Sequence, residues 1–478
     1  LCRDISTQEE FVNMSPGSRA TLIKGFILTA AWLTTMPLYS QAADLLDIYK
    51  RALDHDPVYQ AEMFEYEASR EVYVQARAVL LPSLQFDYSK TESKQDIVSS
   101  DNTVFAKGST SFPTDEQSLS LTQSIYSYSN WAYFKQAKAE VRKVAADLEN
   151  VRQDLVMRVA AAYFTVLREN DSYQAIDAEV KALKNHFQLV DRKFANGLAN
   201  STDLLDAEAR YLQAKARQIE TANNVHDALQ GLKEITGVLP DNLDALGQSL
   251  ALTRPAPSAM SNWVDNAQAN NPVVLSRQSS VDVAWQEVRR QKGGHYPTFD
   301  LVLTQSSKET GGSLFGGGSE VDSQDVVFQM TLPIYSGGAV SSKVRESINR
   351  HYKAQDELEL ALRQVAREAQ AAYTGIVSSI SKVNALQKSV ETFEKAAKGK
   401  RTAFESGVIS SGSVLDSERE LFVARSDFSA ARYDYLMNHL RLKRAVGSLS
   451  EADIMRINRL LNGVSLSTDT KALLAFGG

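Results

Sequence analysis

The chain has 478 residues, a formal net charge of -6 at pH 7 and one cysteine, Cys2. This mild acidity argues against a nucleic-acid partner, because domains that bind nucleic acid present clustered basic charge. A single cysteine also excludes an intrachain disulfide framework.

A secretory signal peptide is predicted near the amino terminus. Met14 opens a short basic stretch, an apolar run covers residues 25–33, and small side chains lead up to Ala42. The apolar run is shorter than the roughly 20 residues of a spanning helix, so a cleaved leader is favoured over an anchoring helix. We interpret residues 1–42 as upstream sequence followed by this leader. The exported chain would then hold no thiol, which argues against thiolate catalysis and acyl anchoring.

Two copies of one plan follow the leader. The first covers residues 43–237 and the second covers 261–447, with a connector at 238–260 and a tail at 448–478 that we expect to be irregular. The matched positions include Pro57 with Pro272, Pro82 with Pro297, Tyr126 with Tyr335, Phe194 with Phe404, Asp206 with Asp416 and Gly237 with Gly447. Because these anchors recur at a nearly constant offset, the pattern indicates an internal duplication.

Each copy begins with a predicted helix followed by a β-hairpin. The helices cover 45–78 and 262–291, and the hairpins cover 82–127 and 297–335, where apolar and polar residues alternate. No window after the leader offers about 18 consecutive apolar residues, so entry into a membrane would use strands rather than a helix.

A long helix follows each hairpin. Apolar residues recur at steps of three and four through 131–196 and again through 340–406, which is typical of a packed helical seam. At about 1.5 Å per residue each helix would reach roughly 100 Å. Short tips at 197–203 and 407–413 follow the long helices, and a further predicted helix follows each tip, over 204–236 and 414–446. We expect the long helices to pack beside shorter helices that are stacked end to end.

The tips carry the strongest resemblance to a known family. Residues 194–207 are similar to the periplasmic helix-turn-helix of the TolC family of outer-membrane efflux and type I secretion ducts. Residues 404–408 and 414–416 resemble its second copy, and residues 431–436 with 442–447 resemble the family's terminal run. The similarity extends from Asp44 to Leu449.

The resemblance implies a mainly α protein with β-strands, built as a trimeric channel-tunnel. Four strands from each subunit of a homotrimer would form a 12-stranded outer-membrane β-barrel, continued by a long periplasmic α-helical (coiled-coil) barrel that ends in a periplasmic tail. Four strands cannot close on themselves, and open edges in lipid leave backbone groups unsatisfied, so other subunits must complete the sheet. The implied partners are outer-membrane lipid, a periplasmic adaptor (membrane fusion) protein, and an inner-membrane ABC exporter or proton-driven pump.

The tip turns are the first candidate functional site. Gly197 and Gly407 would end their helices in the left-handed conformation, while Thr202 or Asp203 and Ser413 would cap the returning helices. Plain helix capping is the alternative interpretation. The resemblance assigns the tips to adaptor docking through Gly197, Leu198, Thr202, Asp203, Leu204, Gly407, Val408, Val414 and Leu415.

Asp416 is the second candidate, at the pore entrance. The resemblance implies that it points into the bore and forms an anionic ring by threefold symmetry, with Asp206 as its repeat counterpart. Such a ring would attract cations and raise the pKa of each carboxyl. A solvated helical charge is the alternative.

The chain departs from the best-known family pattern at this gate. Phe404 and Ile409 stand where the family example has a tyrosine and an arginine, and Ser413 replaces a second aspartate. Asp203 thereby loses its expected cationic partner. We therefore expect closure to depend on packing more than on polar links.

Two other classes of protein remain open. A soluble periplasmic adaptor or scaffold with long helical hairpins would explain the helices, but not two hairpins of alternating strands. An envelope enzyme has little support, since the sequence offers no evident nucleophile, metal-ligand spacing or cofactor loop. We therefore expect no catalytic residues, no cofactor and no metal.

Overall fold

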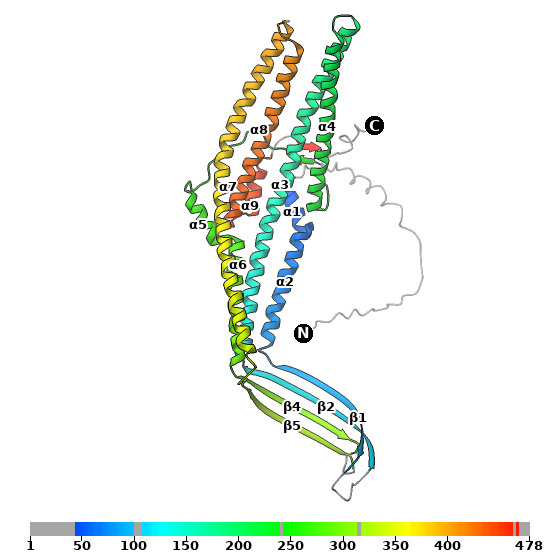
Figure 1. Ribbon diagram of the computed structural model, residues 1–478, viewed down its shortest axis with the longest axis vertical. Coiled ribbons are helices and arrows are strands. Elements are labelled where there is room, and N and C mark those ends of the chain that lie inside the picture. Colours follow the sequence, from blue (N-terminus) through cyan, green and yellow to red (C-terminus); the bar gives the residue numbers. More distant parts are fainter. Residues whose placement is uncertain are drawn as a thin grey trace, which may run out of the picture. The chain divides into compact units, whose positions relative to one another are not determined.

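A computed structural model describes residues 44–99, 108–239, 242–247, 249–312, 317–406, 408–461 and 465–467. The predicted leader lies outside these residues. Each half of the described chain contains one very long helix, shorter helices along it and a β-hairpin (Figure 1).

The first half supplies six main elements. They are α1 (Leu45–His55), α2 (Pro57–Ala78), β1 (Ser83–Ile97), β2 (Gly108–Tyr126), α3 (Tyr128–Ala195) and α4 (Ser201–Thr236). The helix α3 has 68 residues, which corresponds to about 100 Å. Both α2 and α4 pack on it, so two shorter helices are stacked along one long helix.

The second half repeats this arrangement. Its elements are α5 (Met260–Asn270), α6 (Pro272–Lys292), a 3₁₀ turn (Gly293–His295), β4 (Thr298–Thr310), β5 (Ser319–Thr331), α7 (Ala339–Glu405) and α8 (Ser411–Ala445). The helix α7 has 67 residues and carries α6 and α8 in the same way. The halves meet where α3 packs on α6 and on α8.

The four long strands form one antiparallel sheet in the order β1-β2-β4-β5. Its outer strands, β1 and β5, each have one neighbour in this sheet. Leu84, Leu121, Leu303 and Val326 lie side by side across it. Further from the helices the corresponding row is Lys90, Asp115, Glu309 and Glu320. One face of the sheet is therefore apolar only in the half nearest the helices.

The predicted helix over 45–78 is wrong in one respect, because it breaks at Asp56. The one over 262–291 breaks likewise, at Asn271. Each break precedes a proline, which pushes the preceding residue into an extended conformation. Both residues then cap the next helix: the Asp56 carboxylate accepts from the Tyr59 N–H at 2.8 Å, and the Asn271 side chain accepts from the Val273 N–H at 2.9 Å.

The break at Asn271 also joins two stacked helices. Its side-chain amide donates to the Arg444 and Ala445 carbonyl oxygens, at 3.4 and 2.8 Å, where α8 ends. The Arg444 carbonyl also accepts from the Gly447 N–H at 2.9 Å, whereas the Ala445 carbonyl is one of the terminal groups that have no donor within the helix, so the amide satisfies it. The stack of α6 on α8 is thereby fixed by hydrogen bonds as well as by packing.

The main core surrounds the middle of α3. Tyr163 is fully buried there and donates its hydroxyl proton to the Asp244 carbonyl oxygen at 2.7 Å. Buried apolar side chains from α1, α4, α7, α8 and α9 (Glu451–Asn458) complete this cluster. The sheet lies outside it.

Two further expectations are corrected. The tail is not wholly irregular: α9 follows a capping box of Ser450 and Asp453, and β6 (Ser465–Ser467) pairs with β3 (Asn242–Asp244) in the connector. The second hairpin ends at Thr331, before the predicted residue 335, since Pro333 has no N–H to donate. Of the described helices, none is both long and apolar enough to cross a bilayer.

Candidate functional site

The first tip turn connects α3 to α4. Gly197 has φ +70°, as predicted, and its N–H donates to the Phe194 carbonyl oxygen at 2.9 Å. The Leu198 N–H donates to the Lys193 carbonyl oxygen at 2.8 Å. This pair of bonds is a Schellman motif, in which a left-handed residue lets two terminal carbonyls find donors.

The cap of α4 differs from the prediction. Asn200 is the cap, and its side-chain oxygen accepts from the Asp203 N–H at 2.7 Å. Thr202 and Asp203 lie inside the first turn and are exposed, and Leu204 is half-buried. Asn200 was missed because Asn, Thr and Asp all suit this position, and sequence alone does not decide which of three neighbours begins the helix.

The second tip turn connects α7 to α8. The Val408 N–H donates to the Ala403 carbonyl oxygen at 2.9 Å, which matches the bond made by Leu198. Gly407 lies outside the described residues. Ser410 occupies the cap position of α8, so the predicted cap Ser413 instead lies in the first turn, with the two hydroxyl oxygens 3.5 Å apart.

The predicted docking residues divide by exposure. Leu198 and Val408 are 77% and 75% exposed, so each tip presents an apolar side chain to solvent, and Leu205, just inside α4, is 63% exposed as well. Val414 is only 8% exposed and is a packing residue rather than a contact surface. Leu415 is half-buried against a cluster of α3 and α4 residues, which are Ile176, Val180, Leu183 and Ala214. Phe404 and Ile409 are also half-buried.

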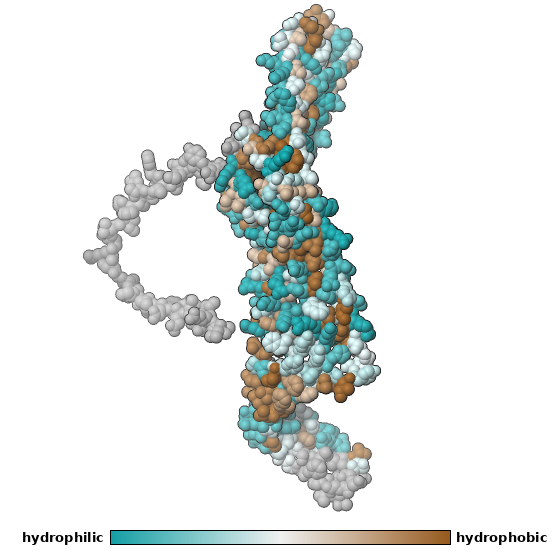
Figure 2. Space-filling model, turned by 90° about the vertical axis from the view of Figure 1, so that its left-hand side faces the viewer, coloured by the Kyte–Doolittle hydropathy of each residue, from teal (hydrophilic) through white to brown (hydrophobic). Residues whose placement is uncertain are grey.

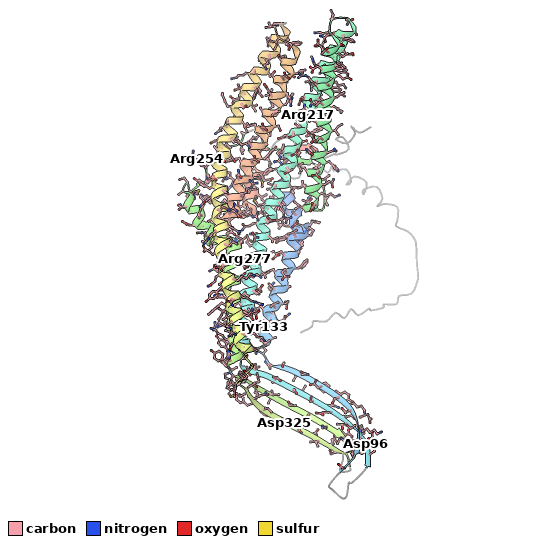
Figure 3. All side chains as sticks on the ribbon, viewed as in Figure 1. Asp96, Tyr133, Arg217, Arg254, Arg277 and Asp325 are labelled. Atoms are coloured by element: carbon pink, nitrogen blue, oxygen red, sulfur yellow. The ribbon has the colours of Figure 1, made fainter. Side chains whose placement is uncertain are left out.

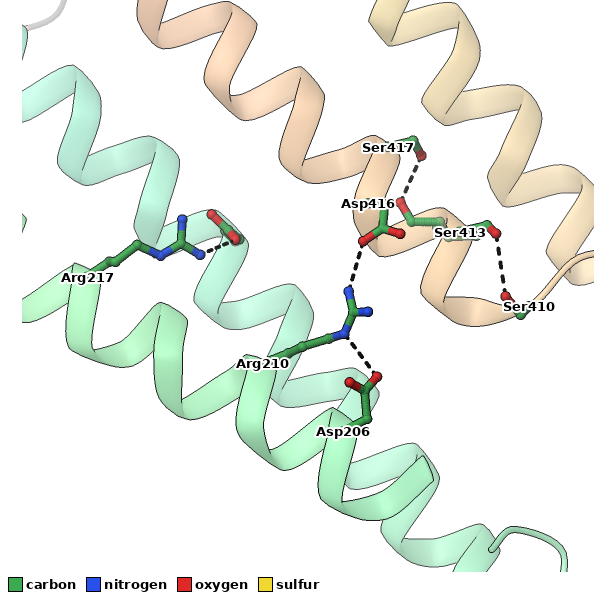
Figure 4. A network of polar contacts seen from close by, with 9 residues as sticks. Asp206, Arg210, Arg217, Ser410, Ser413, Asp416 and Ser417 are labelled. Atoms are coloured by element: carbon green, nitrogen blue, oxygen red, sulfur yellow. Dashed lines mark hydrogen bonds and ion pairs between the residues drawn. The ribbon is translucent and has the colours of Figure 1, made fainter. Parts of the chain in front are cut away.

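One helical pair consists of α3 and α4, and the other consists of α7 and α8. An arginine that the sequence analysis did not identify joins the two pairs. Arg210, on α4, places Nε 3.0 Å from Oδ2 of Asp206 and Nη1 2.9 Å from Oδ1 of Asp416, on α8 (Figure 4). We call these three residues the Arg210 bridge. Its hydrogen bond to Asp416 contributes most to raising the pKa of Arg210, so the guanidinium stays charged.

This bridge bears on two expectations. Asp206 and Asp416, predicted as separate repeat counterparts, share one cation. The prediction that closure depends more on packing than on polar links remains a prediction, beside which the structure places one polar link between α4 and α8. The i,i+4 spacing of Asp206 and Arg210 was visible in the sequence, but Asp416 lies 206 positions further along the chain.

Neighbouring ion pairs have a different geometry. Arg217 Nη2 lies 2.7 Å from Glu179 Oε1, which joins α4 to α3 within one helical pair. Arg401 and Glu418 likewise join α7 to α8. The Arg210 bridge therefore spans the two pairs at this level, while these contacts stay inside one pair. Within the described part of the chain, no group of three or more His, Cys, Asp or Glu side chains is placed to hold a metal ion.

Comparison with known proteins assigns the family. The model of the outer membrane efflux protein family matches residues 48–238 and 263–448, and the chain belongs to this family. The two matched segments correspond to the two halves of the fold.

Individual relatives have similar length. The alkaline protease secretion protein AprF of Pseudomonas aeruginosa is 28% identical, over 89% of this chain and 89% of its own. The outer membrane protein TolC of Escherichia coli strain K12 is 29% identical, over 91% of this chain and 88% of its own. The structure of the CmeC outer membrane channel of Campylobacter jejuni superposes with a TM-score of 0.75 at 17% identity, covering 88% of this chain and 90% of that one.

These findings confirm the predicted fold and location. The chain has the channel-tunnel fold of this family and is an outer-membrane exit duct of the kind used in efflux and type I secretion, with its helices in the periplasm. The alternative of a soluble periplasmic adaptor is not favoured. Members of the family are channel proteins.

Proposed function

We propose that three copies of this chain assemble into one duct, which passes substrates from an inner-membrane pump and a periplasmic adaptor to the cell exterior. The observation that carries the proposal is the four-stranded sheet with two outer strands and one face that is apolar near the helices. A sheet of this kind needs further strands at both edges.

The directions of the strands support this assembly. Successive strands in the order β1-β2-β4-β5 are antiparallel, so β1 and β5 run in opposite directions. The β1 edge of one copy can therefore form an antiparallel ladder with the β5 edge of the next. In lipid this pairing is strongly favoured, because an unpaired backbone polar group costs several kcal/mol there.

The entrance of the duct, which opens and closes, would then lie at the periplasmic end. Leu198 and Val408 are exposed apolar side chains at the two tips and are suited to contact a helical hairpin of the adaptor, with Thr202, Asp203 and Leu204 near Leu198. The Arg210 bridge would hold the two helical pairs together until docking separates them. Asp416 would face the entrance together with its copies in the other subunits.

Disulfide crosslinking tests the assembly directly. The only cysteine is Cys2, in the predicted upstream segment, so introduced cysteines would have no competitor in the exported chain. We expect Gln85→Cys on β1, combined with cysteine at Asp325, Val327 or Gln329 on β5, to give covalent species that end at three chains. These β5 side chains lie on the same face as Gln85 according to the strand register.

The matched control joins two strands of one chain. Ser118 of β2 and Ser306 of β4 are direct neighbours, so Ser118→Cys with Ser306→Cys should give only an intrachain link. Denaturing electrophoresis without reductant separates the two results. A protein that stays monomeric and water-soluble without detergent, with no interchain link for any pair, would refute the proposal.

The relative named for alkaline protease secretion favours a protein cargo. The test is complementation: this chain is expressed in a host that lacks its own duct but retains the protease exporter and adaptor. Protease in the culture medium supports a secretion role. Restored resistance to toxic small molecules without secreted protease supports an efflux role instead.

A further inference from the structure

The ends of four helices adjoin the sheet and carry an unusual charge. We define the basic collar as residues 72–78, 128–138, 284–295 and 339–346. They are the end of α2, the start of α3, the end of α6 with its 3₁₀ turn, and the start of α7. These residues include two acidic side chains, Glu287 and Glu346, against eight basic ones, namely Arg77, Lys135, Lys138, Arg289, Arg290, Lys292, Lys343 and Arg345. The whole chain, by contrast, has a net charge of -6.

The two acids of the basic collar are already engaged. Glu287 Oε2 lies 2.8 Å from Arg290 Nε, and Glu346 Oε1 lies 2.6 Å from Arg350 Nη2. Within the described residues, no carboxylate forms an ion pair with Lys292, Lys343 or Arg345, and all three side chains are exposed. The basic collar therefore presents positive charge that the chain itself does not neutralise.

Aromatic rings lie among these charges. Lys292 Nζ is 5.8 Å from the centre of the Trp285 ring, and Arg289 Nε donates to the Tyr128 hydroxyl at 3.0 Å. Trp131 and Tyr296 are 50% and 46% exposed. Tryptophan and tyrosine gather at the boundary between membrane and water, since each ring has an apolar body and a polar edge.

The basic collar borders the apolar half of the sheet. Hydrophobic side chains gather where the helices meet the strands (Figure 2), and Tyr133 marks this end of α3, whereas Asp96 lies at the far end of β1 (Figure 3). Leu84 on β1 and Phe299 on β4 begin the apolar face within a few residues of the helices. With the helices in the periplasm, this boundary lies at the headgroups of the periplasmic leaflet.

We propose that the basic collar binds anionic phospholipid headgroups of the periplasmic leaflet. A phosphodiester supplies the missing negative charge, and lysine and arginine near an anionic lipid surface are attracted to it over about a Debye length. Trp285 holds Lys292, and Tyr128 holds Arg289, among the aromatic rings at the membrane boundary. Both positive charges therefore lie at the level of the headgroups. The collar would thereby fix the height of the duct in the membrane and select the lipids around it.

Lipid retention measured by native mass spectrometry tests this proposal. The full chain is reconstituted in equal amounts of phosphatidylglycerol and phosphatidylcholine, then transferred to detergent. We expect retained phosphatidylglycerol to exceed phosphatidylcholine by about tenfold or more, because several basic residues act together. In the variant K292Q/K343Q/R345Q the two lipids should be retained about equally.

A matched variant separates a local site from net charge. K395Q/K398Q/K400Q removes the same charge near the tip of α7, the helix that also carries Lys343 and Arg345, while Lys292 lies on α6. This variant should keep the preference of the wild type. Equal loss in both variants would show a general charge effect and overturn the proposal. So would an unchanged preference in K292Q/K343Q/R345Q, which would mean that these side chains face another copy of the chain.

Two further arms complete the test. If K292Q/K343Q/R345Q does not assemble, a salt titration of the wild type replaces it: the preference should fall as added salt shortens the screening length, and a salt-independent preference overturns the proposal. Lipopolysaccharide replaces phosphatidylglycerol in a parallel sample. Retention of lipopolysaccharide that depends on Lys292, Lys343 and Arg345 would place the site in the other leaflet and also overturn the proposal.

Discussion

Arg210 and Arg217 differ in what they connect, although both lie on α4 and both pair with carboxylates. Arg210 reaches Asp416 in the other helical pair, whereas Arg217 reaches Glu179 in its own. The side chain of Asp416 is 58% exposed, while that of Glu179 is 9% exposed. Breaking the Arg210–Asp416 pair therefore costs little free energy, because water solvates both charges. Breaking the Arg217–Glu179 pair would leave a buried carboxylate unpaired and costs more. The exposed environment of the Arg210 bridge thus suits the opening and closing proposed for it.

The first prediction follows from this difference. Arg210→Gln should favour the open tip, because it removes the ion pair that joins the two helical pairs. An exposed ion pair of this kind is worth at most about 1 kcal/mol, so the equilibrium between closed and open tip should shift by roughly fivefold. Single-channel conductance in planar bilayers measures the open fraction. Arg425→Gln, which removes an exposed ion pair to Glu394 between α8 and α7, is the matched control and should leave the conductance near that of the wild type. Equal conductance of wild type and Arg210→Gln would remove the bridge from the closure mechanism.

The second prediction concerns Asp56, whose side chain is 3% exposed and accepts two hydrogen bonds from Arg158, each at 2.8 Å. Burial alone would raise the pKa of Asp56, but Arg158 and the Tyr59 N–H outweigh burial and lower it. The folded state then binds fewer protons than the unfolded state. The resulting stability is present at neutral pH and is lost as the pH falls below about 4.

Arg158→Met should therefore destabilise the chain by about 3–5 kcal/mol at pH 7, since it leaves a buried charge unpaired. Urea unfolding followed by far-UV circular dichroism measures this. The deficit should shrink as the pH is lowered through the acidic range, because Asp56 becomes neutral. A deficit that stays constant down to the lowest accessible pH would contradict the assignment.

At the scale of elements, the tip turn depends on one backbone conformation. Gly197 has φ +70°, and no heavy atom lies within 4 Å of where a Cβ would be, so only the backbone resists a side chain. Gly237, at the other end of α4, has φ +73° and would place a Cβ 3.6 Å from His55. A side chain at either position would meet similar backbone strain, but the two positions lie at opposite ends of α4.

The third prediction uses this pair. Gly197→Val should cost about 1–2 kcal/mol of local strain, distort the tip and reduce export, while detergent-stable oligomers remain. Gly237→Val should lower thermal stability but leave the tip and export intact. Secreted cargo and the oligomer band are measured on the same samples. If Gly197→Val exports normally, the first tip is not the docking surface.

The elements also show how far sequence reasoning reaches. Periodicity predicted α3, α7 and both hairpins, because a face that must be buried imposes its period on the sequence. The proline positions were visible too, yet the breaks at Asp56 and Asn271 were missed, since a helix pattern continues on both sides of each break. The Arg210–Asp416 contact could not be predicted, because it depends on how two helical pairs pack.

At the scale of the whole molecule, the duplication explains how one chain supplies both a sheet and a periplasmic extension. Each half sends one hairpin into the sheet and one long helix away from it, and β2 and β4 join the halves along a ladder from Thr114 to Tyr126. The core around Tyr163 lies in the helical part. We therefore expect the sheet to depend more on its surroundings for stability than the helical part does.

This separation gives a fourth prediction. Removal of detergent should cause loss of the sheet and aggregation, while the helical content changes little. Far-UV circular dichroism and infrared spectra of detergent-depleted samples measure the helix content and the sheet content. Truncation of both hairpins with short Gly/Ser linkers should give a helical protein that is soluble. Complete unfolding of that truncated chain would show that the sheet supports the helices.

The even number of strands in each copy has one last consequence. Because β1 and β5 point in opposite directions, two, three or more copies could all be joined edge to edge with every ladder antiparallel. The direction of the strands therefore does not determine the number of subunits. We expect that number to be set instead by the angle at which helices of neighbouring copies pack, so substitutions that alter stoichiometry should map to α3 and α7 rather than to the strands.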